Sequence, residues 1–383
     1  MLHVYNAPRS GGGSLHATER SIAELRGRGI EVFEFRRDSS LIEPSLSAAL
    51  RTSKTALMGG DATSAFRQEL SRLKPDLVHI NELFPLITPR ILPLCREANI
   101  PVVMSVDDYH LTCPVRTHLR RGLVCTECLG GREWNAVRHN CKGSLTESVV
   151  AAAYNLGFRR RGDYTRHVSH YVAPSEFTRR WLVERFGVAE ADTSAIPLPV
   201  DIPPSGADPG AGSYVAFAGR VVPEKGVDVF LKAVERAGVP VRFARASHFF
   251  QTVPIPDWAE VVIPKDRDEL AAYYRGARLL VMPSLWFETF GLVGAEAMSH
   301  GVPIIVSRIG AVGELVDEGT NGLAFAPGDA DDLAGRITEL WNDPSRCRTL
   351  GTAARAKAIE RWSTERHGSL MVRLYEQVLA SGS

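Results

Sequence analysis

The sequence predicts an α/β protein with two domains, each built on a parallel β-sheet wrapped by helices. The 383 residues exceed one average domain of about 150 residues. Short apolar strand candidates alternate with amphipathic helix candidates, which is typical of parallel sheets covered by helices. This alternating series occurs twice, and a proline-rich segment at 196–204 separates the two occurrences.

The first series begins at the amino terminus. A strand at residues 1–5 leads into a glycine-rich turn, and a helix that contains Ile22 and Leu25 follows and closes at Gly27. Further strands of this series are predicted at 30–35, 76–80 and 101–106. These elements form a βαβ arrangement, so a parallel sheet is expected.

The second series begins with a strand at 213–219 and a helix at 227–237. Its later strands are predicted at 239–243, 260–263, 277–282 and 302–306. The residues from Trp362 to Ala380 are predicted to form a last helix.

Domain limits follow from these two series. The first domain is expected over residues 1–200, with a cysteine-rich insertion at about 113–141, and the second over 201–361. Residues 362–383 form a carboxyl-terminal helical segment.

Composition excludes several classes of protein. With 44% hydrophobic and 23% charged residues, the chain is globular and not disordered. The 45 Lys and Arg against 44 Asp and Glu give no reason to expect nucleic acid as a partner. No apolar run reaches the roughly 20 residues of a membrane span, and the amino terminus does not resemble a signal peptide. We therefore expect a cytoplasmic protein.

Ligands of open parallel sheets bind beyond the carboxyl ends of the strands. Arg220 and Lys225 follow the strand at 213–219 in one turn that begins at Gly219. Arginine offers a rigid fork and lysine a point charge, a pair suited to phosphate oxygens. A solvated surface loop is the alternative interpretation.

A second candidate site follows the strand at 277–282. A helix is expected to begin near Phe290 or Gly291, where backbone amides and the helix dipole favour an anion. Glu288 precedes that start and Glu296 lies about two turns inside the helix. Eight steps of about 100° bring the two within about 80° of each other. Both carboxylates would then accept hydrogen bonds from sugar hydroxyls of one ligand. The alternative is a helix cap and an exposed glutamate.

The amino-terminal glycines form a third candidate. Gly11, Gly12 and Gly13 lack side chains, so backbone can approach a phosphate there. The run matches neither a dinucleotide fingerprint nor a P-loop, and a plain turn explains it equally well.

Four cysteines form a separate cluster with the spacing C-x11-C-x2-C-x12-C. They are Cys113, Cys125, Cys128 and Cys141. The central C-x2-C is a chelating unit, and the flanking thiols would complete a tetrahedral structural zinc site. Labile disulfides or plain thiols would give the same sequence.

Together these motifs resemble the retaining group 1 glycosyltransferases of family four, which have the GT-B fold. The resemblance rests on Gly219-Arg220 with Lys225, on the E-x7-E from Glu288 to Glu296, and on "GAVGELVDEGTNGLAF". It extends to "PDLVHINELFP" and "PVVMSVDDYHLTCP" in the first half. It implies two Rossmann-like domains facing across a cleft, with the last helix crossing back to the first domain.

The resemblance also implies roles for the site residues. Arg220 and Lys225 would bind the diphosphate of a nucleotide-sugar donor, Glu288 the donor sugar and Glu296 the ribose. Backbone beside the phosphate and sugar would come from Gly12, Gly13, Phe290, Gly291, Leu292 and Val293. The implied reaction retains the anomeric configuration and needs no metal or other cofactor.

One position departs from the family pattern. Where family members often have His-Asp, this chain has Asp107-Asp108, and the nearest imidazole is His110. Asp107 takes a modified role, His110 supplies the contact, or neither acts.

The donor is expected to be a UDP- or GDP-sugar, and the acceptor a glycan, a lipid-linked or a small molecule, as in bacterial polysaccharide biosynthesis. A basic stretch suggests an anionic lipid acceptor or peripheral contact with the inner face of a membrane; solvated arginines are the alternative. It comprises Arg116, His118, Arg120, Arg121, Arg159, Arg160, Arg161 and Arg166. A same-fold sugar-nucleotide epimerase and a non-catalytic carbohydrate-binding subunit remain alternatives.

Overall fold

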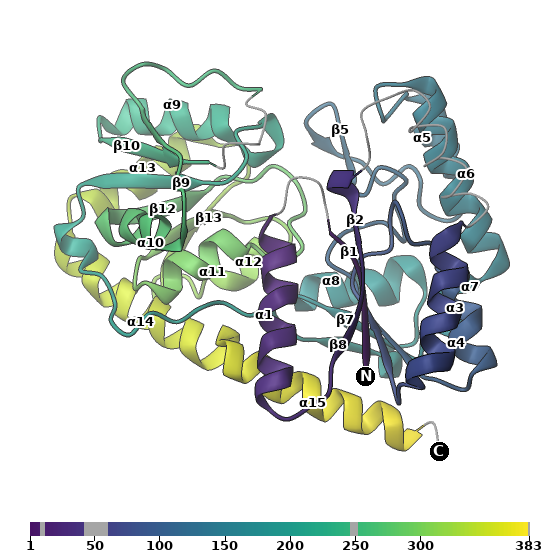
Figure 1. Cartoon of the computed structure of the whole chain (residues 1–383). Helices are drawn as coiled ribbons and strands as arrows, with labels where there is room; N and C mark the ends of the chain where they lie inside the picture. The colour runs from purple at the N-terminus through teal and green to yellow at the C-terminus, as the bar shows by residue number, and fades with distance from the viewer. Residues whose placement is uncertain (8–11, 42–59, 246–251, 382–383) are drawn as a thin grey trace. The chain divides into compact units, whose positions relative to one another are not determined.

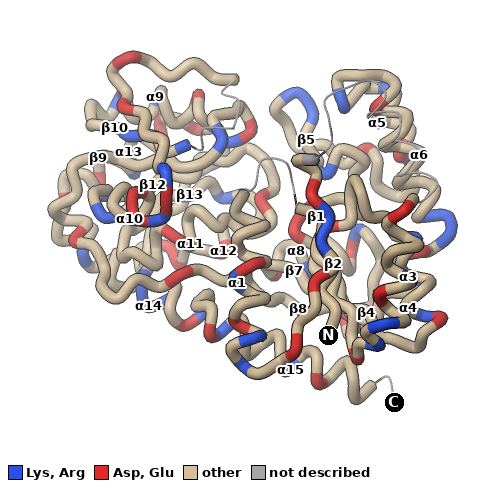
Figure 2. The backbone as a smooth tube through the Cα atoms, viewed as in Figure 1, with Lys and Arg blue, Asp and Glu red and all other residues tan. Residues whose placement is uncertain are grey.

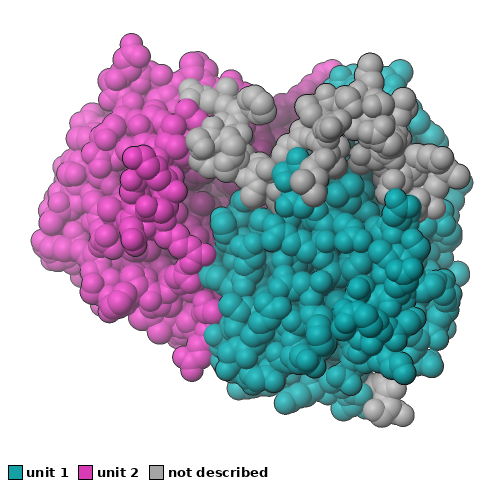
Figure 3. Space-filling view, viewed as in Figure 1, with its two compact units in different colours: residues 1–118, 125–197, 367–383 teal, residues 119–124, 198–366 magenta. Residues whose placement is uncertain are grey.

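The computed structural model of the chain describes residues 1–7, 12–41, 60–245 and 252–381. The chain divides into two compact units (Figure 3). Unit 1 consists of residues 1–118, 125–197 and 367–383, and unit 2 of residues 119–124 and 198–366. Each unit holds one six-stranded sheet (Figure 1), and the pairings are parallel, so the predicted α/β class with two parallel sheets is confirmed.

The sheet of unit 1 has the strand order β2-β1-β3-β4-β7-β8. Its strands are β1 (Leu2–Ala7), β2 (Phe33–Asp38), β3 (Val78–Ile80), β4 (Val102–Ser105), β7 (His170–Ala173) and β8 (Thr193–Ala195). Its helices are α1 (Gly13–Gly27), α3 (Asp61–Leu73), α4 (Leu92–Glu97), α5 (Asn135–Arg138), α6 (Leu145–Arg161), α7 (Asp163–His167), α8 (Glu176–Trp181) and most of α15 (Thr364–Ser381). The strand expected at 30–35 begins only at Phe33, because Gly29 continues the turn after α1 with a φ of 83°.

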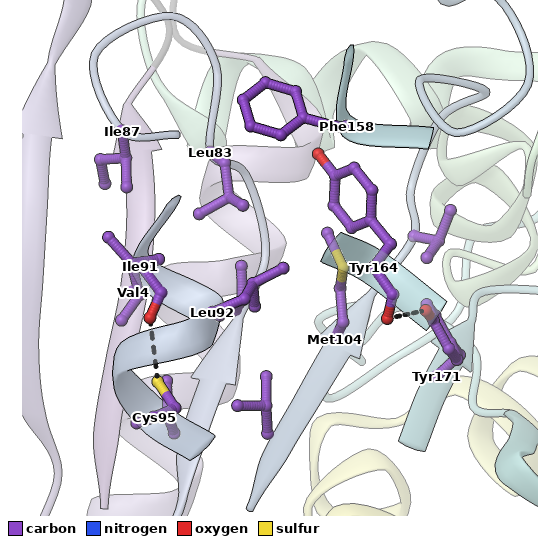
Figure 4. Close-up of a cluster of buried hydrophobic side chains, with 14 of the residues drawn as sticks. Val4, Leu83, Ile87, Ile91, Leu92, Cys95, Met104, Phe158, Tyr164 and Tyr171 are labelled. Carbon is purple, nitrogen blue, oxygen red and sulfur yellow. Dashed lines mark hydrogen bonds between the residues drawn. The ribbon is translucent and has the colours of Figure 1, made fainter. Parts of the chain in front are cut away.

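Both faces of this sheet are covered. Successive residues of a strand point to opposite faces, so Val102 and Met104 of β4 join one apolar core and Val103 joins the other. Figure 4 shows the first core, in which the Tyr171 hydroxyl donates a hydrogen bond of 2.9 Å to the carbonyl of Tyr164. Helix α15 supplies Met371 and Leu374 to the second core.

Buried histidines connect α15 to unit 1 through hydrogen bonds. Nδ1 of His79 lies 2.6 Å from the Tyr375 hydroxyl and Nε2 lies 2.9 Å from Oγ of Ser105. At the other end of the helix, His367 lies 2.9 Å from Oγ of Ser21 and 2.8 Å from the carbonyl oxygen of Pro197. The carboxyl-terminal helix is therefore held by polar contacts as well as by apolar packing.

Two buried histidines of unit 1, His3 and His367, are expected to make the protein less stable in acid. Burial lowers the pKa of His3 and of His367 to about 4, whereas unfolded histidine titrates near 6.5. The unfolded chain thus takes up protons below pH 6.5 that the folded chain does not, so stability falls as the pH falls toward 4. We expect a loss of about 2 kcal/mol for each of the two between pH 7 and pH 5. Denaturant unfolding at pH 7 and pH 5 measures this loss of unfolding free energy. The loss should be smaller in His367→Gln than in the wild type, and equal losses in the two proteins would contradict the prediction.

The sheet of unit 2 has the order β11-β10-β9-β12-β13-β14. Its strands are β9 (Tyr214–Ala218), β10 (Val241–Ala244), β11 (Glu260–Val262), β12 (Ala277–Met282), β13 (Ile304–Ser307) and β14 (Gly322–Phe325). Its helices are α9 (Val227–Ala237), α10 (Arg267–Gly276), α11 (Leu292–Ser299), α12 (Val312–Leu315), α13 (Ala330–Trp341) and α14 (Pro344–Trp362). This is the Rossmann order 3-2-1-4-5-6, and the chain changes direction along the sheet between β9 and β12.

Candidate functional site

Three loops of unit 2 meet beyond the carboxyl ends of β9, β12 and β13, which are neighbours in the sheet. The amide of Leu285 donates to the carbonyl of Glu224 at 2.9 Å, which joins the first loop to the second. The amide of Ala311 donates to the carbonyl of Glu288 at 3.1 Å, which joins the third. These loops lie at the point where the strand order reverses, the usual ligand position in such sheets.

Glycine makes the close approach of the first two loops possible. Gly226 has a φ of 71°, and a Cβ added there would lie 1.8 Å from the carbonyl oxygen of Pro283. No side chain fits at that distance. The neighbouring Lys225 is therefore held against the loop that carries Glu288.

Lys225 and Glu288 form the centre of the site. Nζ of Lys225 lies 2.5 Å from Oε1 of Glu288, and the Ser284 hydroxyl donates to the same oxygen at 2.8 Å. Glu288 is only 7% exposed. Burial alone would raise the pKa of its carboxyl, but the charge and hydrogen bond of Lys225 outweigh burial and lower it. Glu288 is thus ionised at neutral pH and fixed in direction.

Arg220 supplies a second cation at the edge of the same loop. Its side chain is 38% exposed and its guanidinium lies 3.5 Å from Glu224. An exposed pair of this kind contributes little stability. Arg220 can therefore exchange Glu224 for an incoming anion.

Helix α11 begins at Leu292, after Gly291 with a φ of 99°, and no side chain caps its amino terminus. Its first-turn amides, including those of Leu292 and Val293, point toward any anion placed there. Phe290 is buried and packs edge-on against Trp362, with ring centroids 6.0 Å apart.

Glu288 precedes α11, as the sequence predicts, and it lies in the loop before the helix. Glu296 lies in the second turn of α11 and accepts a hydrogen bond of 3.1 Å from the Tyr274 hydroxyl. Each carboxylate is thus positioned by its own partner, and Tyr274 lies outside the motifs that the sequence marks.

Unit 1 gathers a second polar group beyond the carboxyl ends of β1, β3 and β4. Gly12, with a φ of 123°, precedes the start of α1 at Gly13, whereas Gly11 lies outside the described residues. The Ser14 hydroxyl donates to Oδ2 of Asp107 at 3.0 Å. The glycine turn and Asp107 are therefore brought together within this unit.

An ion-pair network lies beside Asp107. Asp108 binds Arg116 at 2.7 Å and Nδ1 of His110 at 2.7 Å, and Arg116 also binds Glu82. Arg116 and His110 lower the pKa of Asp108 despite its burial. His110, a candidate substitute for the family histidine, is thus turned toward Asp108.

The pKa of Asp107 shifts in the opposite direction from that of Asp108. Burial, with smaller contributions from the charges of Asp108 and Glu82, raises its pKa to about 6 although Ser14 lowers it. Ionising Asp107 therefore costs stability as the pH rises above the unfolded value near 3.9 and through 6. We expect the substitution Asp107→Asn to change Tm more favourably at pH 8 than at pH 5, with a difference of about 2 °C or more between the two changes. Thermal unfolding at the two pH values checks this; an equal shift at both would contradict it.

The four cysteines of the insertion are free thiols, and Cys113 and Cys128 are buried. Burial raises the pKa of Cys128 to about 12, and the other three cysteines add to this rise. Among the described residues, no three Cys, His, Asp or Glu side chains are arranged to hold a metal ion. Structural zinc stays a prediction, which metal analysis of the purified protein tests.

The basic stretch of unit 1 is only partly available to a ligand. Arg116 is held in the network above, Arg159 binds the buried Glu133 at 2.5 Å, and His118 is buried against Trp181. These three residues of the stretch are therefore engaged within unit 1. Arg160 and Arg166 remain exposed.

Comparison with known proteins identifies the family. Residues 11–202 match the family model described as Glycosyltransferase Family 4, and residues 202–357 match Glycosyl transferases group 1. This chain belongs to the family 4 group 1 glycosyltransferases. The D-inositol 3-phosphate glycosyltransferase of Streptomyces bingchenggensis is 29% identical to this glycosyltransferase over 258 residues, 61% of this chain and 55% of the relative.

A second relative is the MMP alpha-(1->4)-mannosyltransferase of Mycolicibacterium hassiacum, 29% identical over 229 residues and 56% of either chain. The alignments of this glycosyltransferase thus span about half the length of both relatives. Two solved structures share its fold. Sucrose-phosphate synthase from Thermosynechococcus elongatus covers 100% of both chains with a TM-score of 0.71 and 18% identity. HepE from Anabaena in complex with UDP covers 98% of this chain and 99% of its own, with a TM-score of 0.65 and 19% identity.

The two Rossmann-like units of this glycosyltransferase therefore belong to the GT-B fold. In the described part of the chain, no helix has the length and apolar character needed to span a membrane.

Proposed function

We propose that this protein is a retaining glycosyltransferase that moves a hexose from a nucleotide-diphosphate sugar to an acceptor. The observation that carries the proposal is the pairing of Lys225 with the buried, ionised Glu288 where the strand order of unit 2 reverses. A UDP-sugar is the first candidate donor, because HepE has been solved with UDP-glucose as well as with UDP. A GDP-sugar is the second.

Different residues of unit 2 bind the diphosphate, the donor sugar and the ribose. Arg220 and Lys225 neutralise the charge that grows on the departing diphosphate, and the amides of α11 add hydrogen bonds to its oxygens. Glu288 accepts from hydroxyls of the donor sugar, and Glu296 accepts from the ribose. The acceptor hydroxyl attacks the anomeric carbon from the face that the diphosphate leaves, so the anomeric configuration is retained. The departing phosphate takes the proton of that hydroxyl, and no metal is needed.

The acceptor is a glycan, a lipid-linked or a small molecule that unit 1 recognises near Asp107. Product analysis tests the reaction. The protein is incubated with UDP-glucose or GDP-mannose, with and without sugar and lipid-linked acceptors, and products are followed by mass spectrometry and proton NMR. A glycoside with the anomeric configuration of the donor, formed equally well in EDTA, is expected. Epimerised nucleotide sugar without any acceptor would overturn the proposal.

A further inference from the structure

Two adjacent tyrosines of helix α10 are buried, and their hydroxyls have different kinds of partner. The hydroxyl of Tyr273 lies 2.8 Å from the carbonyl oxygens of Phe217 and of Arg242, which anchors α10 to β9 and β10. Backbone is the common partner of a side-chain hydrogen bond. The hydroxyl of Tyr274 instead donates at 3.1 Å to Oε2 of Glu296. Tyr274 therefore contacts the carboxylate that we assign to the ribose of the donor.

Unit 2 holds both ends of this contact in place. Helix α11 packs closely on the sheet, since a Cβ added to Gly294 would lie 2.5 Å from Sδ of Met282. His300 ends α11, and its ring lies 5.1 Å from the ring of Tyr274. Nδ1 of His300 donates to the carbonyl of Glu296 at 2.9 Å, because a carbonyl can only accept. The hydroxyl and the carboxylate thus have little freedom to separate.

The hydroxyl of Tyr274 restricts a side chain that is otherwise mobile. Glu296 is half-buried, and a glutamate on a helix surface has several rotamers open to it. Burial and the charge of Glu296 raise the pKa of Tyr274 well above its ordinary value, so the hydroxyl stays a donor. A carboxylate offers about four lone-pair positions, and Tyr274 uses one of them. The hydrogen bond therefore orients the carboxylate without filling its capacity to accept.

The position of Glu296 on α11 matches the distance between a diphosphate and its ribose. Glu296 lies four residues after Leu292, the first residue of the helix, or about 6 Å along the axis. Side chains of a helix lean toward its amino terminus, so Glu296 leans toward the anion position at the start of α11. Figure 2 shows red Asp and Glu segments near the α10 and α11 labels. A ribose whose 5′-diphosphate binds at that start can reach Glu296 with its hydroxyls.

We propose that Tyr274 is a positioning residue that makes the donor site select ribonucleotides over 2′-deoxyribonucleotides, acting through Glu296. The neighbouring 2′- and 3′-hydroxyls of ribose donate to an oriented carboxylate, whereas 2′-deoxyribose lacks one of the two donors. A site built to bind a hydroxyl rejects the analogue that lacks it, because an acceptor of the site then stays unpaired. The inference rests on the proposed donor site and adds the class of nucleotide that this site takes.

Isothermal titration of UDP and of 2′-deoxy-UDP into the full chain tests the proposal. The wild type should bind UDP at least about tenfold more tightly than 2′-deoxy-UDP. Tyr274→Phe keeps the ring that packs against His300 and removes only the hydroxyl. It should lower this ratio to about threefold or less, by weakening UDP and leaving 2′-deoxy-UDP nearly unchanged. If the wild type does not bind UDP, GDP or ADP and their 2′-deoxy forms replace the pair.

The matched control is Tyr273→Phe, which removes the hydroxyl of the other buried tyrosine on the same helix. Any weakening there should affect both nucleotides equally, so the ratio should stay that of the wild type. A double-variant cycle tests the route through Glu296. Glu296→Ala should lower the ratio by itself, and adding Tyr274→Phe should then change it no further. Glu296→Ala leaves Tyr274 in place, so it tests the same ratio even where Tyr274→Phe is unstable.

Three results would overturn the inference while the donor site stands. The wild type binds the ribonucleotide and its 2′-deoxy form equally well, or Tyr274→Phe or Glu296→Ala keeps the wild-type ratio. Alternatively, Tyr274→Phe still lowers the ratio in the Glu296→Ala background. Failure of the wild type to bind any of the nucleoside diphosphates would instead overturn the proposed function, and this inference with it.

Discussion

Glu288→Gln is expected to lower turnover by about a hundredfold to a thousandfold while the protein stays folded. Glutamine keeps the size of the side chain and its hydrogen bond from Ser284, but it removes the charge that faces Lys225 at 2.5 Å. Lys225 then loses the partner that aims it, and donor hydroxyls lose an ionised acceptor. Steady-state kcat and KM with a sugar donor, together with the Tm of both proteins, measure the effect.

The matched control for this change is Glu260→Gln. Glu260 is 55% exposed and pairs with Arg242 on the sheet of the same unit, so removing its charge should leave turnover unchanged. Wild-type turnover in Glu288→Gln would contradict the assignment of the site.

Gly226→Ala is expected to destabilise unit 2 by about 3 kcal/mol or more and to abolish donor binding. The residue has a φ of 71°, and its new Cβ would lie 1.8 Å from the carbonyl oxygen of Pro283. The two loops that hold Lys225 and Glu288 must then separate. Denaturant unfolding and calorimetry with UDP-glucose measure the two consequences.

Gly238 provides the control for backbone strain. It ends α9 with a φ of 62°, and a Cβ there would meet nothing within 4 Å. Gly238→Ala should therefore cost only about 1 kcal/mol, the penalty of the left-handed conformation itself. Equal losses in the two variants would show that the loops do not depend on their close approach.

Sequence periodicity predicted most strands of unit 2, although strand β14 (Gly322–Phe325) was not predicted. Helix α9 (Val227–Ala237) and strand β12 (Ala277–Met282) have the predicted limits, because their apolar residues follow a clear period. Strand β8 was not predicted, because its three residues, Thr193–Ala195, do not form an apolar run. Only its pairing with β7 makes it a strand, and that contact is not written in local sequence.

In the candidate site, too, local motifs were predicted but contacts between distant residues were not. Lys225 and Glu288 were each predicted as donor ligands, yet their direct contact was not. They are separated by 63 residues, and they meet only because β9 and β12 are neighbours in the sheet. The pairing of Arg116 with Glu82 was missed for the same reason, and it engages one cation of the basic stretch.

Isothermal titration of UDP-glucose into the wild type and into Lys225→Ala tests whether Lys225 binds the diphosphate of the donor. We expect saturable binding by the wild type and at least about tenfold weaker binding by the variant, since the diphosphate loses a charge-assisted contact. If UDP-glucose does not bind, GDP-, ADP- and dTDP-sugars are titrated in turn. Equal affinity in the two proteins, or no binding of any of these nucleotide sugars at millimolar concentration, would contradict the assignment of the donor site.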